Sequence, residues 1–528
     1  MKRILTLAIL LAVLSTAFAQ LKHRGRPENT TDYSHPALIP GIKRVGSLAT
    51  APLKCMGTKH VPVVLVQFAD KRFDISGSTD AEVHDIYDKF FNGTRIPGQR
   101  YTDSQNYGSV SDYFIAQSDS QFIPDFEVIG PITLAEGYAY YGSNSPYKDA
   151  NIQKFYNEAC QKAVTNFDVD WNYFDNDHNG TIDFVFFIYA GEGENAYYDN
   201  LPEHLNLIWP KEQASPISVD INGARLTFGG YGCTNEEYEG IQDGIGTCIH
   251  ELSHAIGLPD FYDTNYIAFG LDAWDVMDYG NYLPSGYATH PCGYSAYEKD
   301  FMGWRKMQNI SHDEHLSLTL QPIENRDGIA YKIENPANPN EYFILENRQN
   351  IDWDGKLVYF YRKYGSGHGL LISHVDYTSS AWTGNRVNTD RNHQHFTIVP
   401  ADGKLMPRDN DRLEEYARSL IRDAYPGPDS VTEMTSYFVF TGGSIPMTVT
   451  NIKEHADGTI TLDLNGGATR TTIGDANEDG KVDVLDVVAI ADHILNDADI
   501  NIRNADANND GVIDVLDIVA VSAIILGN

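Results

Sequence analysis

The stretch GTCIHELSHAIGLPDFYD, Gly246–Asp263, limits the possible folds more than any other part of this 528-residue chain. On an α-helix, His250 and His254 lie one turn apart on the same face, so both imidazoles can reach one metal ion. Glu251 lies beside them, where its carboxylate can accept a proton from water. The pattern H-E-x-x-H also occurs by chance, as a histidine pair satisfied within an ordinary helix. The residues that follow favour the metal site.

A third metal ligand must come from another part of the chain. Gly257 and Pro259 can end the helix sharply, because glycine tolerates the left-handed backbone conformation. Asp260 would then return to the ion as an oxygen ligand. The competing design takes a glutamate from a later helix, but no glutamate lies between Glu251 and Glu298. The sequence therefore predicts one zinc ion with these three ligands: His250, His254 and Asp260.

The pattern H-E-x-x-H-x-x-G-x-x-D resembles the metzincin zinc signature, with aspartate where many members have a third histidine. The extension GLPDFYD is similar in particular to the immune inhibitor A family of secreted bacterial metallopeptidases. Metzincins have a methionine turn beneath the metal, and Met277 in AWDVMDYG corresponds to it, with an ordinary core methionine as the alternative. The resemblance also places Tyr279 near the oxyanion, against the alternative of a common buried tyrosine.

The family resemblance extends over roughly residues 61–465, because VPVVLVQFAD (Val61–Asp70), GSVSDYF (Gly108–Phe114) and LENRQ also resemble the family. It implies a secreted zinc endopeptidase that acts on proteins or peptides, in which Glu251 passes a proton from water to the leaving amine. The alternative is a surface binding protein, such as an adhesin, that keeps the protease fold. The intact Glu251 argues against that alternative.

Hydrophobic patterns predict a mixed α/β (α+β) domain over 61–310, and the family resemblance implies that this domain is metzincin-like. Val61–Asp70 and Asp183–Gly191 are apolar runs typical of buried strands, and helices are expected at Asp80–Phe91 and Lys154–Phe167. Beyond it, short runs such as LSLTLQPI and GLLISHV alternate with turn residues, which predicts a β-rich, sandwich-like domain over 311–465. A polar linker, 466–473, separates it from a last module, 474–528.

The last module contains an internal repeat, because DANEDGKVDVLD from Asp475 returns as DANNDGVIDVLD from Asp506, 31 positions later. Oxygen side chains at positions 1, 3, 5, 9 and 12, with glycine at position 6, follow the spacing of calcium loops. Acidic turns without metal are the alternative. The predicted ligand positions for two calcium ions are Asp475, Asn477, Asp479, Lys481, Asp483, Asp486, Asp506, Asn508, Asp510, Val512, Asp514 and Asp517.

Aspartate at the twelfth position, with an apolar helix after each loop, is similar to the type I dockerin module, a small all-α domain. The resemblance implies calcium-dependent docking to a cohesin-like partner. The tenth and eleventh loop positions often decide which cohesin binds. Here they are Val484, Leu485, Val515 and Leu516, where the best-known dockerins have hydroxyl residues. A more hydrophobic contact is therefore expected.

Two weaker signals remain. The stretch DNDHNGTID begins like a third calcium loop but has Phe186 at the twelfth position, so a plain Asx-Gly turn is an equal alternative. His374 and Asp376 end a predicted strand, where a hydrogen-bonded pair is favoured over a second metal site. The possible third calcium site comprises Asp175, Asp177, Asn179 and Asp183.

The N-terminus has a basic start, an apolar run and small residues at Ala17 and Ala19, which predicts a signal peptide over 1–19 and secretion. An uncleaved anchor is the alternative, but the run is short for a bilayer span, and no membrane span is expected in the mature chain. Residues 20–60 have no regular pattern, so they are expected to be the pro-segment of a zymogen or an irregular lead-in. Cys55 there could block an open zinc position, against the alternatives of a half-cystine or an inert thiol.

Composition restricts the partners and the cross-links. The formal net charge of −34 argues against nucleic acid as a partner, which would need clustered lysine and arginine. Five cysteines are too few for a scaffold that depends on disulfides. At most two bridges can form, and their pairing is left open.

Overall fold

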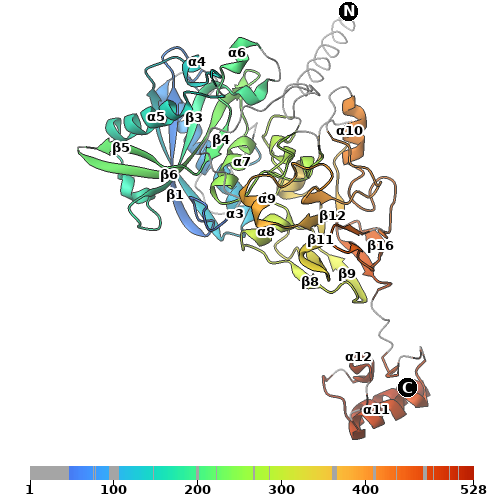
Figure 1. Ribbon diagram of the computed structural model, residues 1–528. Helices are drawn as coiled ribbons and strands as arrows, with labels where there is room; N and C mark the ends of the chain where they lie inside the picture. The colour runs from blue at the N-terminus through green and yellow to red at the C-terminus, as the bar shows by residue number, and fades with distance from the viewer. Residues whose placement is uncertain are drawn as a thin grey trace, which may run out of the picture. The chain divides into compact units, whose positions relative to one another are not determined.

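The computed structural model describes most of the chain beyond the N-terminus (Figure 1). The predicted signal peptide, 1–19, and most of the predicted pro-segment lie outside the described residues. Those residues are 47–527, with gaps at 75–76, 78, 94–105, 147, 198–200, 222, 266–267, 285, 360–364, 408–411, 436, 468–472, 478, 480, 497, 499 and 509.

A seven-stranded sheet organises the first half of the chain. Strands β1, β2, β3 and β6 run parallel, and β4, β5 and β7 pair antiparallel with β6. In spatial order the strands are β2 (Phe122–Thr133), β1 (Gly57–Gln67), β3 (Ile182–Glu192), β6 (Ala224–Tyr238) and β4 (Lys211–Gln213), with β5 (Ile217–Ile221) and β7 (Ile241–Gln242) beside β6.

Helices cover both faces of this sheet, as Figure 1 shows. Val63 and Leu65 of β1 belong to a core that includes α2 (Asp80–Asn92), α3 (Val110–Gln117) and α7 (Ile245–Ala255). Val64 and Val66 belong instead to the core formed with α5 (Ile152–Asn166). Successive residues of a strand point to opposite faces, so a central strand buried on both sides is apolar throughout. The predicted mixed α/β architecture is confirmed.

The predicted elements agree with the observed ones except at their ends. The strand expected at Val61–Asp70 is β1, and it begins four residues earlier, at Gly57, within the range expected to be irregular. Asp183–Gly191 is β3, and the two expected helices are α2 and α5. The remaining short helices of this half are α4 (Tyr138–Tyr141), η1 (Trp171–Phe174), η2 (Glu194–Ala196), α6 (Pro202–Leu205), η3 (Asp272–Trp274), η4 (Tyr279–Tyr282) and α8 (Ala296–Phe301).

The second half is rich in strands, as its turn-separated apolar runs predict. A five-stranded sheet contains β13 (Phe396–Ile398), β12 (Gly369–Asp376), β11 (Asn338–Arg348), β10 (Tyr331–Asn335) and β8 (Gln308–Ile310), in that order. The other elements are β9 (Leu316–Leu320), η5 (Asp352–Lys356), α9 (Ser379–Thr383), α10 (Leu413–Leu420), β14 (Phe438–Val439), β15 (Gly443–Ser444), β16 (Val449–Glu454) and β17 (Ile460–Leu464). That these sheets form a sandwich stays a prediction.

One hydrophobic core contains side chains from both predicted domains. Phe261 from the first range packs with Trp382 and Phe396 from the second, at ring-centroid distances of 6.4 and 5.0 Å. The buried guanidinium of Arg348 in β11 donates to the main-chain oxygens of Trp274 and Gly293 at 3.0 and 3.1 Å. The strands of the second half thus brace the segment that follows α7, and the boundary at 310 stays a prediction.

The chain divides into two compact units, and the second contains the C-terminal repeat. It comprises Asp313–Leu318, Met447–Asn451 and Leu462–Asn528. Its small core joins Ala476, Ile490, Ala505 and Val521. The helices of this module are α11 (Val484–Asn496), α12 (Ile502–Ala505) and α13 (Val515–Leu526).

The described structure contains no disulfide bond, which agrees with the small number of cysteines. All five cysteines are buried and free. Burial raises the pKa of Cys55, whose thiol lies 3.5 Å from the main-chain oxygen of Met302, so the structure favours the inert thiol.

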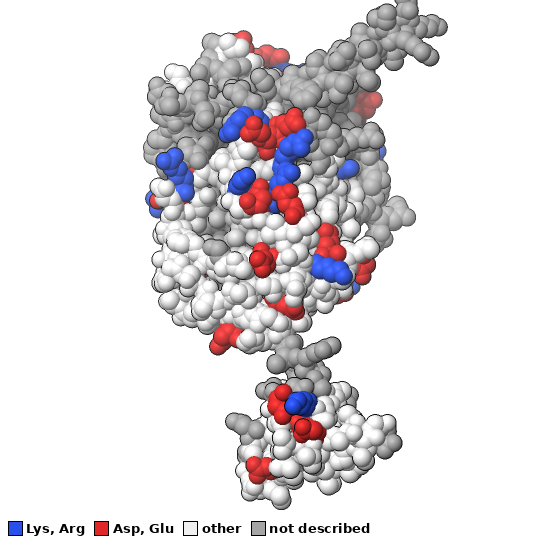
Figure 2. All heavy atoms as spheres, turned by 90° about the vertical axis from the view of Figure 1, so that its right-hand side faces the viewer, with Lys and Arg blue, Asp and Glu red and all other residues white. Residues whose placement is uncertain are grey.

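Among the described helices, none has the length and apolar character needed to cross a bilayer. On the face drawn in Figure 2, described lysine and arginine side chains lie among aspartates and glutamates.

Candidate metal centre

Helix α7 is held in place by close backbone packing. All of its residues are buried. A side chain at Gly246 would place its Cβ 1.8 Å from the main-chain oxygen of Asn281, so only glycine permits this approach. Because α7 carries His250, Glu251 and His254, this packing determines where these three side chains lie.

The chain reverses direction after α7, as the glycine and proline predict. Gly257 has a φ of +113°, a backbone conformation that other residues rarely adopt. A Cβ at Gly257 would also lie 3.2 Å from the main-chain nitrogen of Leu48. The turn brings Asp260 back to the helix face that carries the two histidines.

The three predicted metal ligands meet at one point. The distance from Asp260 Oδ1 to His250 Nε2 is 3.2 Å, and to His254 Nε2 it is 3.1 Å. Ligand atoms about 2 Å from a tetrahedral ion are ~3.3 Å apart, so these spacings fit a shared ion of that geometry. Asp260 is 1% exposed and His254 is fully buried, so protein rather than solvent surrounds the point.

Main-chain oxygens determine which ring nitrogen of each histidine faces the ion position. His250 Nδ1 donates to the oxygen of Val276 at 2.9 Å, and His254 Nδ1 donates to that of Leu258 at 2.7 Å. In a neutral imidazole, a protonated Nδ1 leaves the lone pair on Nε2. Both Nε2 atoms are therefore prepared as metal ligands.

Asn385, from the segment after α9, holds Asp260 at two points. Its Nδ2 donates to Asp260 Oδ2 at 2.6 Å, and its Oδ1 accepts from the main-chain nitrogen of Asp260 at 2.7 Å. Oδ1 of Asp260 then faces the histidines. Asn385 lies 125 positions from Asp260 in the sequence, and no sequence motif identifies it.

Electrostatics at this centre favour a cation. Burial lowers the pKa of His250, but the hydrogen bond to Asp260 and the charge of Glu251 outweigh it, so its pKa lies above its ordinary value. Neither His254 Nε2 nor Glu251 Oε2 makes a hydrogen bond to the described residues. Buried polar atoms without such a bond are rare, and a bound ion or water is the usual explanation.

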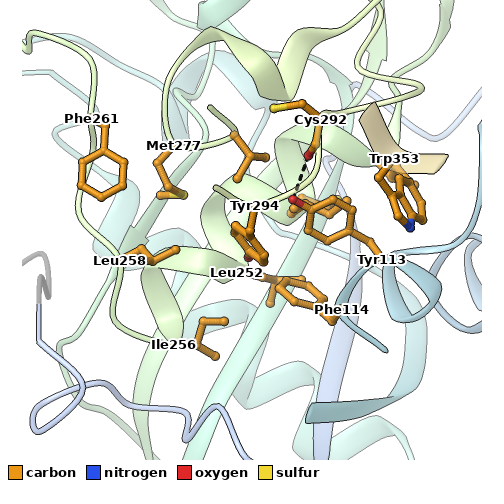
Figure 3. Close-up of a cluster of buried hydrophobic side chains, with 14 of the residues drawn as sticks. Tyr113, Phe114, Leu252, Ile256, Leu258, Phe261, Met277, Cys292, Tyr294 and Trp353 are labelled. Carbon is orange, nitrogen blue, oxygen red and sulfur yellow. Dashed lines mark hydrogen bonds between the residues drawn. The ribbon is translucent and has the colours of Figure 1, made fainter. Parts of the chain in front are cut away.

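Met277 and Tyr279 are both buried and lie in the segment that follows Asp260 in the sequence. Met277 lies in the same buried cluster as Leu258 and Phe261 (Figure 3), and its main-chain oxygen accepts from the nitrogen of Phe261 at 2.9 Å. The turn that contains Met277 also supplies the Val276 oxygen to His250. Tyr279 is 3% exposed and begins η4. A role for Tyr279 near an oxyanion stays a prediction.

The two loops of the C-terminal repeat have matching internal hydrogen bonds. Asp486 and Asp517, at the twelfth positions, are fully buried and turned into their loops. Gly511 has a φ of +82°, as the sharp bend requires, whereas Gly480 lies outside the described residues. The matching bonds join Asp479 N to Asp475 Oδ1 (3.1 Å), Asp510 N to Asp506 Oδ1 (3.1 Å), Asn477 N to Asp486 Oδ1 (3.1 Å) and Asn508 N to Asp517 Oδ1 (3.2 Å).

The incomplete third loop also gathers carboxylates. Oxygens of Asp175, Asp177 and Asp183 lie within 4.8 Å of one another. Burial, with the charges of Asp177 and Asp175, raises the pKa of Asp183 to about 6. Asp175 also accepts from the main-chain nitrogens of Asn179 and Gly180, as in an Asx-Gly turn. The loop thus has both the gathered carboxylates of a calcium site and the hydrogen bonds of an Asx-Gly turn, so calcium at this loop stays a prediction.

Comparisons with known families agree with this arrangement. The profile described as immune inhibitor A peptidase M6, catalytic domain, matches residues 54–309, and the dockerin type I domain profile matches residues 473–526. The chain therefore contains a peptidase domain of a metal-dependent class, followed by a type I dockerin domain.

Individual relatives belong to the same peptidase class. The chain is 24% identical over 311 residues to the pre-pro-metalloprotease PrtV of Vibrio cholerae, which covers 54% of this chain and 34% of the relative. It is 25% identical over 291 residues to immune inhibitor A of Bacillus thuringiensis, which covers 48% of this chain and 42% of the relative. The chain thus spans about a third of the length of the first relative and about two fifths of the length of the second.

Proposed function

We propose that the protein is a zinc-dependent endopeptidase that hydrolyses peptide bonds of protein substrates. The observation that carries the proposal is the convergence of His250 Nε2, His254 Nε2 and Asp260 Oδ1 around one buried point. Two imidazoles and one carboxylate leave a fourth position of a tetrahedral zinc ion for water or substrate. Zinc held there lowers the pKa of water toward neutrality and polarises the peptide carbonyl.

Glu251 is proposed as the general base and acid. It follows His250 on α7, is 6% exposed, and its Oε2 makes no hydrogen bond to the described residues. A carboxylate in this position accepts the proton of the attacking water and delivers it to the leaving amine. Tyr279 is proposed to donate a hydrogen bond to the developing oxyanion, and Met277 to support the turn beneath the ion.

The experiment that tests this proposal separates metal binding from chemistry. Glu251→Gln should keep zinc but lower kcat on casein about 10²- to 10⁴-fold, because only the proton transfer is lost. His250→Gln should lose zinc and activity together. His368→Gln is the matched control, because His368 pairs with Glu454 at 2.7 Å in another part of the structure. Casein cleavage by Glu251→Gln at the wild-type rate would refute the assignment.

A binding protein that only keeps the protease fold is the competing function. A zinc chelator such as 1,10-phenanthroline separates the two, because it should abolish casein cleavage by the activated wild-type protein and leave a mere binding protein unaffected. Absence of cleavage by zinc-loaded, processed protein would favour the binding protein.

The dockerin domain is proposed to bind two calcium ions and then a cohesin-like partner. Val484, Leu485 and Val488 are 65, 55 and 58% exposed on the first half. Their equivalents in the second half, Val515, Leu516 and Val519, are 62, 55 and 61% exposed. Apolar side chains exposed at matching positions of both repeats suit a hydrophobic partner surface.

The N-terminal segments complete the proposal. Residues 1–19 are proposed as a signal peptide and the segment after them as a pro-segment, so the protein would act outside the cell or at its surface. The name pre-pro-metalloprotease of one relative supports this arrangement. N-terminal sequencing of the secreted protein tests it.

A further inference from the structure

A second cluster of histidines and a carboxylate lies outside the candidate metal centre, at the end of β12. Possible ligand atoms of Asp376, His393 and His395 lie within 4.8 Å of one another. Asp376 is the last residue of β12, and the two histidines precede β13, which pairs antiparallel with β12. The main-chain nitrogen of Asp376 donates to the oxygen of His395 at 2.8 Å. This pairing brings both imidazoles beside the carboxylate.

Each imidazole of this cluster turns one ring nitrogen toward Asp376. His395 Nδ1 lies 2.7 Å from the main-chain oxygen of Asp376 and 3.6 Å from its Oδ2, so a bound ion would take the place of the hydrogen on this nitrogen. His393 Nε2 lies 2.7 Å from Asp376 Oδ2, so the two share one proton. A metal ion can replace that proton, because a neutral imidazole and a carboxylate are both ligands of zinc.

The surroundings allow an ion to enter and keep the ligands in place. The side chains of His393 and His395 are 38 and 20% exposed, whereas that of Asp376 is 10% exposed. The ring of His393 stacks on Phe440 at 3.6 Å between centroids, and the two histidine rings lie 4.5 Å apart. The cluster is therefore open to solvent on one side and supported on the other.

We propose that Asp376, His393 and His395 form a second zinc site, with solvent as the remaining ligand. Two imidazoles and one carboxylate suit zinc better than calcium, which prefers oxygen ligands. The expected pair, His374 with Asp376, is not the one that forms, because His374 Nε2 instead lies 3.1 Å from Glu341 Oε1.

An ion at this second site would hold the segment 385–395, which also contacts the first site. Asn385 at one end of the segment holds Asp260. Asn388 donates to the main-chain oxygens of Phe261 and Phe396, both at 2.7 Å. The second zinc would thus have a structural role, because it fixes the end of the segment opposite Asn385.

Zinc stoichiometry of the full chain tests the proposal. The protein is stripped of metal, dialysed against micromolar zinc with excess calcium to fill the calcium loops, and analysed for zinc per chain. Wild type and His368→Gln should hold two zinc ions. The double variant His393→Gln/His395→Gln and the double variant His250→Gln/His254→Gln should each hold one.

The outcomes separate this site from the proposed catalytic one. Wild-type zinc content in His393→Gln/His395→Gln, or only one zinc in the wild type that is lost with His250 and His254, would overturn the second site. Wild-type content in His250→Gln/His254→Gln would instead overturn the catalytic site. Asp376→Asn keeps the shape of the side chain, and in the His250→Gln/His254→Gln background it should abolish the rise in melting temperature that zinc produces. A rise that persists in that triple variant also contradicts the proposal.

Discussion

At the scale of single residues, Asn385 has a role that no local pattern indicates. It adopts a φ of +51° and holds both the main chain and the carboxylate of Asp260. Residues that orient a metal ligand usually affect metal affinity 10- to 100-fold. The position of Asp260, a proposed zinc ligand, therefore depends on a distant segment of the chain.

Replacement of Asn385 should weaken zinc binding without removing any ligand. We expect Asn385→Ala to raise the Kd for zinc about 10- to 100-fold, because Asp260 loses both hydrogen bonds. Asn451→Ala is the matched control. Asn451 has a φ of +53° and donates to Asp463 at 2.7 Å, so the same change removes the same type of bond elsewhere. Equal zinc affinity in the two variants, measured by competition with a chromogenic chelator, would contradict the account.

The buried carboxyl of Glu194 should make the unfolding free energy depend on pH. Burial, with the charge of Asp149, outweighs Lys148 and raises the pKa of this carboxyl to about 7 from an ordinary value of 4.5. The folded state therefore holds this proton more tightly than the unfolded state. The stabilising contribution is complete below about pH 4.5 and is lost as the pH rises through 7.

Urea unfolding at pH 5 and pH 8, with calcium held constant, measures this effect. Relative to Glu194→Gln, the wild type should lose as much as about 2.5 kcal/mol of unfolding free energy between the two pH values. Glu415→Gln is the control, because its side chain is 64% exposed. A difference between wild type and Glu194→Gln that does not change with pH would contradict the prediction.

At the scale of elements, the close packing of α7 requires glycine at Gly246, although glycine is a poor helix former. Alanine at Gly246 should favour the helix by roughly 1 kcal/mol, but its Cβ would lie 1.8 Å from the backbone of Asn281. A backbone atom cannot rotate away, so we expect Gly246→Ala to lower the unfolding free energy by about 1–3 kcal/mol. Zinc affinity should fall as well, because the helix that carries both histidines must shift. A more stable variant with unchanged zinc affinity would contradict this description of α7.

Much of this element-scale arrangement could be predicted from the sequence. The strands β1 and β3 are continuous apolar runs, and the turn after α7 follows from Gly257, so the approach of Asp260 to the histidines was predictable. Asn385 was not, because its contact depends on how the strands of the second half pack on the first. The cluster at Asp376 was missed for the same reason, since His393 and His395 approach it only through the pairing of β12 with β13.

At the scale of the whole molecule, the proposed zinc sites and the proposed calcium loops of the dockerin domain should respond to different chelators. The dockerin unit has a core of few residues, so its folding should depend on calcium in the two loops. Treatment with EGTA in excess of total calcium and zinc, followed by dialysis into calcium-free buffer that contains zinc, should abolish the calorimetric transition of this unit and leave that of the larger unit. The double variant Asp486→Ala/Asp517→Ala should lack the EGTA-sensitive transition from the start. A transition that survives both treatments would contradict calcium-dependent folding.

Anomalous X-ray scattering at the zinc edge, from crystals of the full chain grown with zinc, tests the central claim most directly. The account predicts a zinc peak about 2 Å from His250 Nε2, His254 Nε2 and an oxygen of Asp260. No peak at that position in zinc-saturated crystals, or a peak from which Asp260 is turned away, would contradict it.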